Sequence, residues 1–258
     1  MESNQEVQIS TNAIISFTDS YTQNKQRKEK ELLEFESKSA RAIISFTDSY
    51  AQNKQRKQNE QQESESTLSL AQVTSRLESL SNQIQYNNGC KLVIQIPKLL
   101  QSLIALVTFR IGTHLKQEID LQRIEVRRQS RWCLSSIQVY GDEQIQSELV
   151  RQGYGRVMSI TLSKAGGIDE EQDEEIYNGL RSISRFLRGL HAGRNNDYQP
   201  SFQPLPLLAR RSIEQLEEEG ANEEIEAQMN NRYNGLIKVW ANDAKDMILN
   251  CFIYRRRR

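Results

Sequence analysis

The sequence predicts an all-α fold, because the stretch from Ile124 to Leu190 holds four helical patterns separated by short turns. The clearest pattern spaces its apolar residues by four, three, four and three positions, which places them on one face of a helix; they are Ile176, Leu180, Ile183, Leu187 and Leu190. Asp142 precedes the second helix, where its carboxylate can cap free backbone N–H groups. Gly153 follows that helix, because glycine tolerates the left-handed conformation at a helix end. We therefore expect successive amphipathic helices joined by tight turns.

The other helices of this stretch follow from the same spacing. The first ends near Tyr140 and carries an apolar face made of Val126, Cys133, Leu134 and Ile137. The second covers residues 144–151. The third begins after the glycine and has Val157, Ile160 and Thr161 on one side. The fourth begins after the acidic loop of residues 168–176, where carboxylates suit the N-terminal end of the helix dipole.

The first 67 residues differ in character from the rest. The segment from Ala13 to Lys28 recurs almost unchanged from Ala42 to Lys57, and the copies differ only where Thr22 is replaced by Ala51. Each copy is predicted to form a helix. We interpret one copy as packing on the following helices and the other as a duplicate with nothing to pack on. Residues 58–69 are polar and low in complexity, which is typical of a linker, so this first region is expected to be partly disordered.

Helical spacing resumes after the linker. An apolar stripe at three-four spacing is made of Leu70, Val73, Leu77, Leu80 and Ile84. It favours the first helix of a repeat, with a coiled-coil seam as the alternative. Ile96 and Pro97 mark the start of another helix. Residues 110–123 connect that helix to the one ending near Tyr140, partly by extending it.

Three of the four prolines lie between residues 193 and 208, and proline lacks the amide that a helix interior requires. We expect an irregular connection there, whose Phe202, Leu205 and Leu207 pack on the helices; a polyproline-like docking arm is the alternative. Ser212 and Gln215 form a capping-box pattern, which predicts that the next helix starts there. The last helix carries one apolar stripe, made of Trp240, Ala244, Met247 and Cys251.

Several of these strings resemble armadillo repeats. EVRRQSRWCLSSI resembles the third helix of such a repeat, and QIQSELVRQGYGRVMSI resembles the first and second helices of the next. NNGCKLVIQIPKLLQSLI is similar in its glycine turn and Ile-Pro start. IEQLEEEGANEEIEAQ, followed by WANDAKDMILNCFI, is similar to the terminal repeat of importin-alpha proteins. The resemblance covers roughly residues 68–254, before a basic tail at 255–258, and implies a right-handed α-solenoid of about three irregular armadillo-like repeats.

Composition argues against several function classes. The 258 residues hold 34 basic and 34 acidic side chains, which argues against a general nucleic-acid binder. No apolar run approaches the length of a membrane span, so we predict no membrane partner and a cytoplasmic or nuclear protein. The three cysteines are scattered in apolar surroundings and are expected to be buried thiols in a reducing compartment. His114 and His191 each stand alone, so no metal site is predicted.

The motifs of common enzymes are missing from the sequence. The pair Gly166-Gly167 has no GxGxxG frame, and no GxSxG elbow occurs. The acidic clusters at residues 169–175 and 217–226 fall at helix starts, where acids stabilise the dipole. We therefore predict no catalytic activity and no cofactor. The two NKQRK runs and the tail from Arg255 to Arg258 have two interpretations, either targeting signals or solvated chain ends.

The preferred hypothesis is a non-catalytic protein-interaction scaffold, because such solenoids bind partners on the concave face lined by the third helix of each repeat. The predicted binding surface uses exposed positions of three helices: Arg127, Arg128, Arg131, Trp132, Ser135, Asn178, Arg181, Arg185, Asn242, Asp246 and Asn250. A protein or peptide partner is expected. Binding of a basic peptide by the acidic clusters is the sharpest form of the hypothesis.

Two alternatives stay open. One is a nuclear-transport adaptor, since importin-alpha groove repeats carry a tryptophan with an asparagine four residues later. Here Trp132 is followed by Ser136 at that distance, which departs from the pattern. The other is a self-associating structural protein, held together by the leucine-rich face of residues 70–84 and by the duplicated N-terminal helices.

Overall fold

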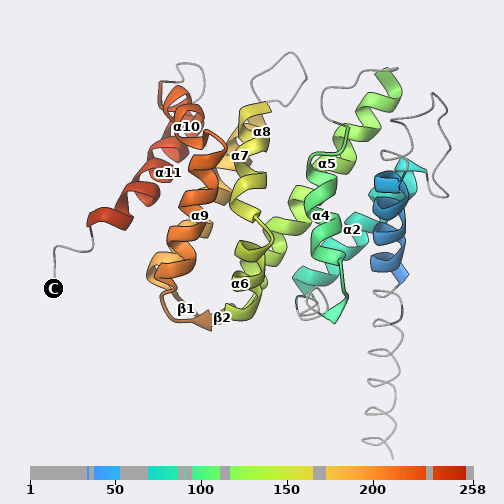
Figure 1. Cartoon of the computed structure of the whole chain (residues 1–258), viewed down its shortest axis with the longest axis horizontal. Helices are drawn as coiled ribbons and strands as arrows, with labels where there is room; N and C mark the ends of the chain where they lie inside the picture. The colour runs from blue at the N-terminus through green and yellow to red at the C-terminus, as the bar shows by residue number, and fades with distance from the viewer. Residues whose placement is uncertain are drawn as a thin grey trace, which may run out of the picture.

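The computed structural model describes residues 34, 38–52, 69–86, 90, 95–110, 117–164, 173–230 and 235–253, and most of them are helical. The helices follow one another across the molecule in chain order, from the helix of residues 38–52 (blue) to the last helix (red) (Figure 1). The prediction of an all-α fold is confirmed, apart from one short β-hairpin. The labelled elements are α2 (Leu70–Tyr86), α4 (Leu99–Val107), α5 (Gln117–Tyr140), α6 (Glu143–Arg151), α7 (Tyr154–Lys164), α8 (Asp173–Ala192), β1 (Arg194–Asn196), β2 (Gln199–Phe202), α9 (Pro206–Glu218), α10 (Ala221–Met229) and α11 (Gly235–Ile253).

Two successive groups of helices share one length pattern. In the first, α6, α7 and α8 have 9, 11 and 20 residues. In the second, α9, α10 and α11 have 13, 9 and 19 residues. The long helices α5, α8 and α11 each pack on the helix just before them, and α8 also packs on α11. A short, short, long succession therefore recurs along the chain.

One apolar core runs through these helices. The five-residue stripe of α8 and the four-residue face of α5 that the spacing predicts are both buried. Most of the α2 stripe is buried too, because α2 packs on α5, where the Cys133 thiol donates to the Leu77 carbonyl at 3.1 Å. The leucine-rich face that we considered for self-association is thus largely covered within the chain.

The second copy of the duplicated segment takes part in this core. The helix of residues 38–52 buries Ile43 and Phe46. The Phe109 ring lies 5.5 Å from the Phe46 ring and 4.8 Å from the Tyr50 ring, measured between centroids. This copy therefore shares a core with the helices that follow residue 67, whereas the first copy, at residues 13–28, lies outside the described residues.

The predicted helix ends are found where local chemistry requires them. The Asp142 carboxylate accepts a hydrogen bond from the Ile145 amide at 3.1 Å, which caps α6. Gly153 and Gly220 have φ of +83° and +74°, the left-handed conformation that side chains disfavour. These turns reverse the chain between short helices and thereby set the order of α6, α7, α9 and α10.

The irregular proline-rich connection is a wrong prediction, because β1 and β2 pair there as an antiparallel hairpin. The side chain of Asn196 accepts from the Tyr198 amide at 3.2 Å and forms the turn. Phe202 is buried and Leu205 half-buried, as expected, but Leu207 is 81% exposed. The proline segment therefore reaches the core through two of the three predicted contacts.

Arg194 explains why the hairpin lies where it does. Its guanidinium donates to the carbonyl oxygens of Val139 at 2.5 Å, Gly141, and Pro200 at 2.8 Å. The last carbonyls of a helix have no partner within the helix. The hairpin arginine thus covers the C-terminal end of α5 and ties it to the segment that follows α8.

The capping box at Ser212 and Gln215 is also wrong. Helix α9 already begins at Pro206, whose fixed φ suits the first helical turn and which needs no amide partner there. Ser212 lies inside the helix, and its hydroxyl donates to the Leu208 carbonyl at 2.9 Å. Gln215 is buried and donates to the Val150 carbonyl at 2.8 Å, so it joins α9 to α6 rather than capping a terminus.

Candidate functional site

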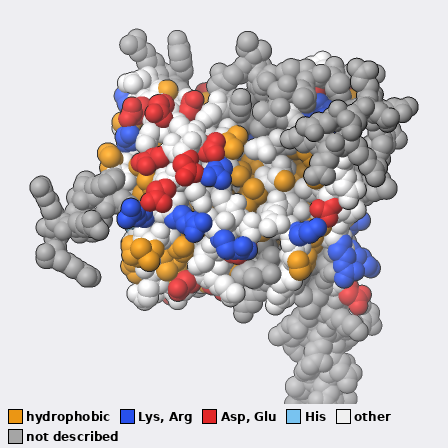
Figure 2. All heavy atoms as spheres, viewed as in Figure 1, with side chains coloured by type: hydrophobic (Ala, Val, Ile, Leu, Met, Phe, Trp, Pro, Cys, Tyr) orange, Lys and Arg blue, Asp and Glu red, His pale blue; other side chains and the backbone are white. Residues whose placement is uncertain are grey.

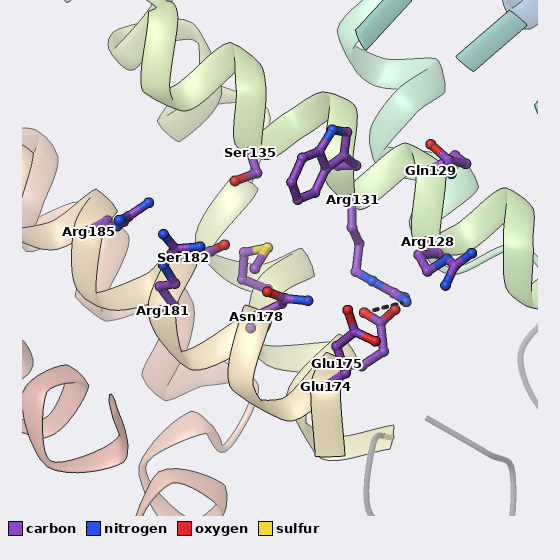
Figure 3. Close-up of a pocket in the computed structure, with 13 residues that line it drawn as sticks. Arg128, Gln129, Arg131, Ser135, Glu174, Glu175, Asn178, Arg181, Ser182 and Arg185 are labelled. Carbon is purple, nitrogen blue, oxygen red and sulfur yellow. Dashed lines mark ion pairs between the residues drawn. The ribbon is translucent and has the colours of Figure 1, made fainter. Parts of the chain in front are cut away.

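The candidate site is a cavity of about 300 Å³ between α5 and α8, with α7 beneath it (Figure 3). We call it the α5–α8 groove. It is lined by Arg128, Gln129, Arg131, Trp132, Ser135, Met158, Glu174, Glu175, Asn178, Gly179, Arg181, Ser182 and Arg185. Seven of these residues belong to the predicted binding surface, so the structure brings together side chains from two helices that are far apart in sequence.

The groove residues share one face of each helix because of their spacing. On α5, Arg128, Trp132 and Ser135 recur at four and three positions, and on α8 Asn178 and Arg185 are seven apart. Residues at these intervals lie above one another on a helix. The apolar stripes of both helices occupy other faces and are buried in the core, so the polar faces are left to form the walls of the groove.

An ion pair joins the two walls. The Arg131 guanidinium lies 2.9 Å from the Glu175 carboxylate, and the side chains are 9% and 14% exposed (Figure 3). A charge pair removed from water is costly to break, because either partner alone would remain buried and uncompensated. The pair therefore fixes the separation of α5 and α8 at the end of the groove where α8 begins.

Two guanidiniums on the α8 wall lack such a partner. Arg181 and Arg185 make no ion pair with a carboxylate in the part of the chain that the structure describes, and the Arg181 Nε is buried without a hydrogen-bond partner there. The pKa of Arg185 is lowered from its usual value, mostly by burial and to a smaller extent by the neighbouring Arg181 guanidinium. The next arginine on the stripe, Arg188, is paired with Asp243 of α11 at 2.5 Å. Of these three arginines of α8, Arg181 and Arg185 thus have no carboxylate partner among the described residues, whereas Arg188 has one.

Trp132 is the large apolar side chain of the groove. It is 52% exposed, although a tryptophan normally buries much of its surface. The residue four positions later, Ser136, lies in the interface with α2, where its hydroxyl accepts from the Gln85 side chain at 3.0 Å. An asparagine ladder of the importin-alpha kind therefore has no counterpart beside this tryptophan.

The remaining predicted surface residues lie elsewhere. Arg127 is buried, and its guanidinium donates to the Phe109 carbonyl at 3.3 Å, so we correct its placement from surface to core. Asn242 and Asp246 are exposed on α11 but do not line the groove, and Asn242 donates to the Lys238 carbonyl at 2.7 Å. The side chain of Asn250 lies outside the described residues.

Sequence reasoning missed part of the lining, in particular Gln129, Glu174, Glu175 and Ser182. The sequence position of the two glutamates predicts only that they stabilise the dipole at the first turn of α8, where they do lie. The missed signal was the helical spacing from Glu174 to Asn178 and Arg181, which continues the predicted α8 face into the first turn.

Acidic side chains gather elsewhere, over α10 and the neighbouring end of α9 (Figure 2). Several are already neutralised within the chain. Arg156 contacts Glu218 at 2.5 Å and Glu219 at 2.9 Å, and Lys245 contacts Glu226 at 2.7 Å. This surface is consequently a weaker candidate for a basic peptide than its carboxylate content suggests.

The described residues contain no group of three or more side chains able to hold a metal ion. His191 lies 3.0 Å from the Met247 carbonyl through its Nε2. Burial raises the pKa of both Cys90 and Cys133 to about 12, as expected for thiols packed as small apolar groups. Among the helices that the structure describes, none is long and apolar enough to cross a bilayer.

No protein-family model matches the chain, and no curated protein sequence matches it either.

Proposed function

We propose that this chain is a non-catalytic scaffold that binds a peptide, or an extended segment of a protein, in the α5–α8 groove. The single observation that carries the proposal is the groove itself. An exposed indole, amide and hydroxyl side chains, and several guanidiniums face one cavity between two helices that the core and the Arg131–Glu175 pair hold in place. Aromatic and arginine side chains are the types that supply most binding energy at protein interfaces.

The arrangement of helices supports the same proposal. The recurrence of two short helices and one long helix, with each long helix packed on the helix before it, is what a right-handed solenoid of armadillo-like repeats would require. In such a solenoid the long third helices line the binding face. Both walls of the groove are long helices, α5 and α8, so the site occupies the position that this architecture would use for a partner.

A library of random short peptides, displayed and selected on the full chain, tests the proposal without assuming a ligand. We expect selected peptides to lose at least tenfold in affinity when Trp132→Ala removes the indole, because a central aromatic anchor commonly contributes more than 1 kcal/mol. Leu207→Ala is the matched control, since it removes an exposed apolar side chain on α9, outside the groove.

The variants must keep the fold for this comparison, which helical circular dichroism and the melting temperature check. Peptides that lose affinity with Trp132→Ala and keep it with Leu207→Ala, which we call groove-dependent, support the proposal. Selection that yields only peptides indifferent to Trp132→Ala refutes it, because binding would then lie elsewhere on the molecule.

A further inference from the structure

We infer that the ligand of the α5–α8 groove is an acidic peptide segment, whose carboxylates pair with Arg181 and Arg185 while an apolar side chain packs on Trp132. The inference rests on the proposed function and adds the chemistry of the partner to it. The inferred ligand is negatively charged, whereas the acidic clusters in the sequence suggested a positively charged peptide.

The charge balance of the groove is the first argument. Its lining holds four arginines and two glutamates, so the net formal charge is two positive, although the whole chain is formally neutral. One arginine, Arg131, is matched by Glu175. Another, Arg128, lies 2.6 Å from Glu125 on its own helix. The charges of the lining that remain, two arginines and Glu174, all lie on α8 and sum to one positive charge.

The two α8 arginines are the second argument. Arg181 and Arg185 are one helical turn apart, and they stand together on the same wall of the cavity (Figure 3). Their pairing needs are unmet among the described residues, including a buried Nε–H donor on Arg181. A guanidinium offers several donors in a rigid fork that matches a carboxylate. Two such forks side by side form a receptor for acidic side chains on one extended strand of peptide.

The third argument comes from a comparison with the acidic surface over α10 and the neighbouring end of α9. The carboxylates of Glu218, Glu219 and Glu226 already have cationic partners within the chain. A basic peptide would compete with these internal pairs for part of the carboxylates of the cluster, whereas an acidic peptide in the groove would meet two guanidiniums without a carboxylate partner among the described residues. The lowered pKa of Arg185 agrees with this, because burial and then the neighbouring Arg181 guanidinium both disfavour its charged form.

Peptides selected for groove-dependent binding provide the test. We expect them to be enriched in Asp and Glu relative to the input library. Exchange of their acidic residues for Asn and Gln should weaken binding to the full chain about tenfold or more, the loss expected when a charged hydrogen bond is removed. Binding should also weaken as salt is raised. Lysine-substituted versions should not bind measurably.

The matching protein variants are Arg181→Gln and Arg185→Gln, which remove charge and keep most of the side-chain length. Each should weaken the acidic peptide about tenfold and should leave its Asn/Gln counterpart unchanged, a difference that a merely structural defect would not produce. Arg210→Gln is the control, because Arg210 is an exposed arginine of α9 that is paired with Glu214 and does not line the groove.

The outcomes separate the two proposals. Groove-dependent peptides that are neutral or basic overturn the acidic ligand and leave the scaffold function standing. A single-stranded oligonucleotide that displaces the acidic peptides and binds more tightly than they do overturns the peptide assignment in favour of a nucleic acid. Absence of any groove-dependent peptide overturns both.

Discussion

Three glycines give the sharpest test of the fold, because alanine is expected to act differently at each. Gly153 lies between α6 and α7 with φ of +83°, and a Cβ there would meet no heavy atom within 4 Å. Only backbone strain opposes Gly153→Ala, about 1 kcal/mol. Gly193 has φ of +73°, and its Cβ would also lie 2.7 Å from the Phe202 carbonyl oxygen. Gly179 is helical, with open space around its Cβ.

The expected changes in melting temperature follow from these environments. Gly179→Ala should stabilise the chain by roughly 0.5–1 kcal/mol, because alanine is the better helix former. Gly153→Ala should destabilise it by about 1 kcal/mol, and Gly193→Ala by about 2–3 kcal/mol, because backbone must also move. For a domain of this size, 1 kcal/mol corresponds to about 2–4 °C.

Thermal unfolding of the full chain, followed by circular dichroism at the helical band, measures the series. Gly153→Asn is the internal control, because asparagine tolerates the left-handed conformation better than alanine and should lose less stability. If Gly153→Ala melts at the same temperature as the parent chain, or if Gly179→Ala melts at a lower temperature than Gly153→Ala, the helix–glycine–helix turn is misplaced.

Three further changes probe other contacts. Glu175→Gln should lower the free energy of unfolding by about 3 kcal/mol in urea titrations, because it leaves the Arg131 guanidinium buried without its carboxylate; a loss below about 0.5 kcal/mol would mean that water screens the pair. Arg194→Lys should cost about 1–3 kcal/mol in the same titration, since an ammonium cannot reach both the Val139 carbonyl in α5 and the Gly141 carbonyl just beyond it, and an unchanged midpoint would contradict that anchoring. Cys90 and Cys133 should resist a thiol reagent at pH 8 until the chain unfolds, because burial raises both pKa values to about 12, so reaction of more than one of the three thiols in the folded chain would argue against their burial.

Features set by neighbours in sequence could be predicted well. The N-cap at Asp142 needs only the three residues that follow it, and the left-handed glycine at 153 needs only the end of α6. The buried stripe of α8 follows from spacing alone, since one side of an amphipathic helix must leave water. These signals are local, so no knowledge of the packing partner was required to find them.

Features that depend on a distant partner could not be predicted in the same way. Ser212 and Gln215 match a capping box locally, but Pro206 starts the helix a turn and a half earlier and Gln215 bonds to Val150 of α6. The hairpin at 194–202 depends on Arg194 reaching the end of α5, which precedes it by more than fifty residues. Two short strands held by one long-range contact produce no clear pattern of apolar and polar residues in the local sequence.

The groove combines both kinds of information. Arg128 and Trp132 could be assigned to one exposed face because they are one turn apart, whereas Arg127 is rotated by about 100° and points to the Phe109 carbonyl instead. Which charges remain uncompensated depends on pairs formed across space, since Glu175 neutralises Arg131 while no described carboxylate reaches Arg185. A formally neutral sequence can therefore present a positive groove, and the charge of the proposed partner is inferred from the pairing of the helices rather than from composition.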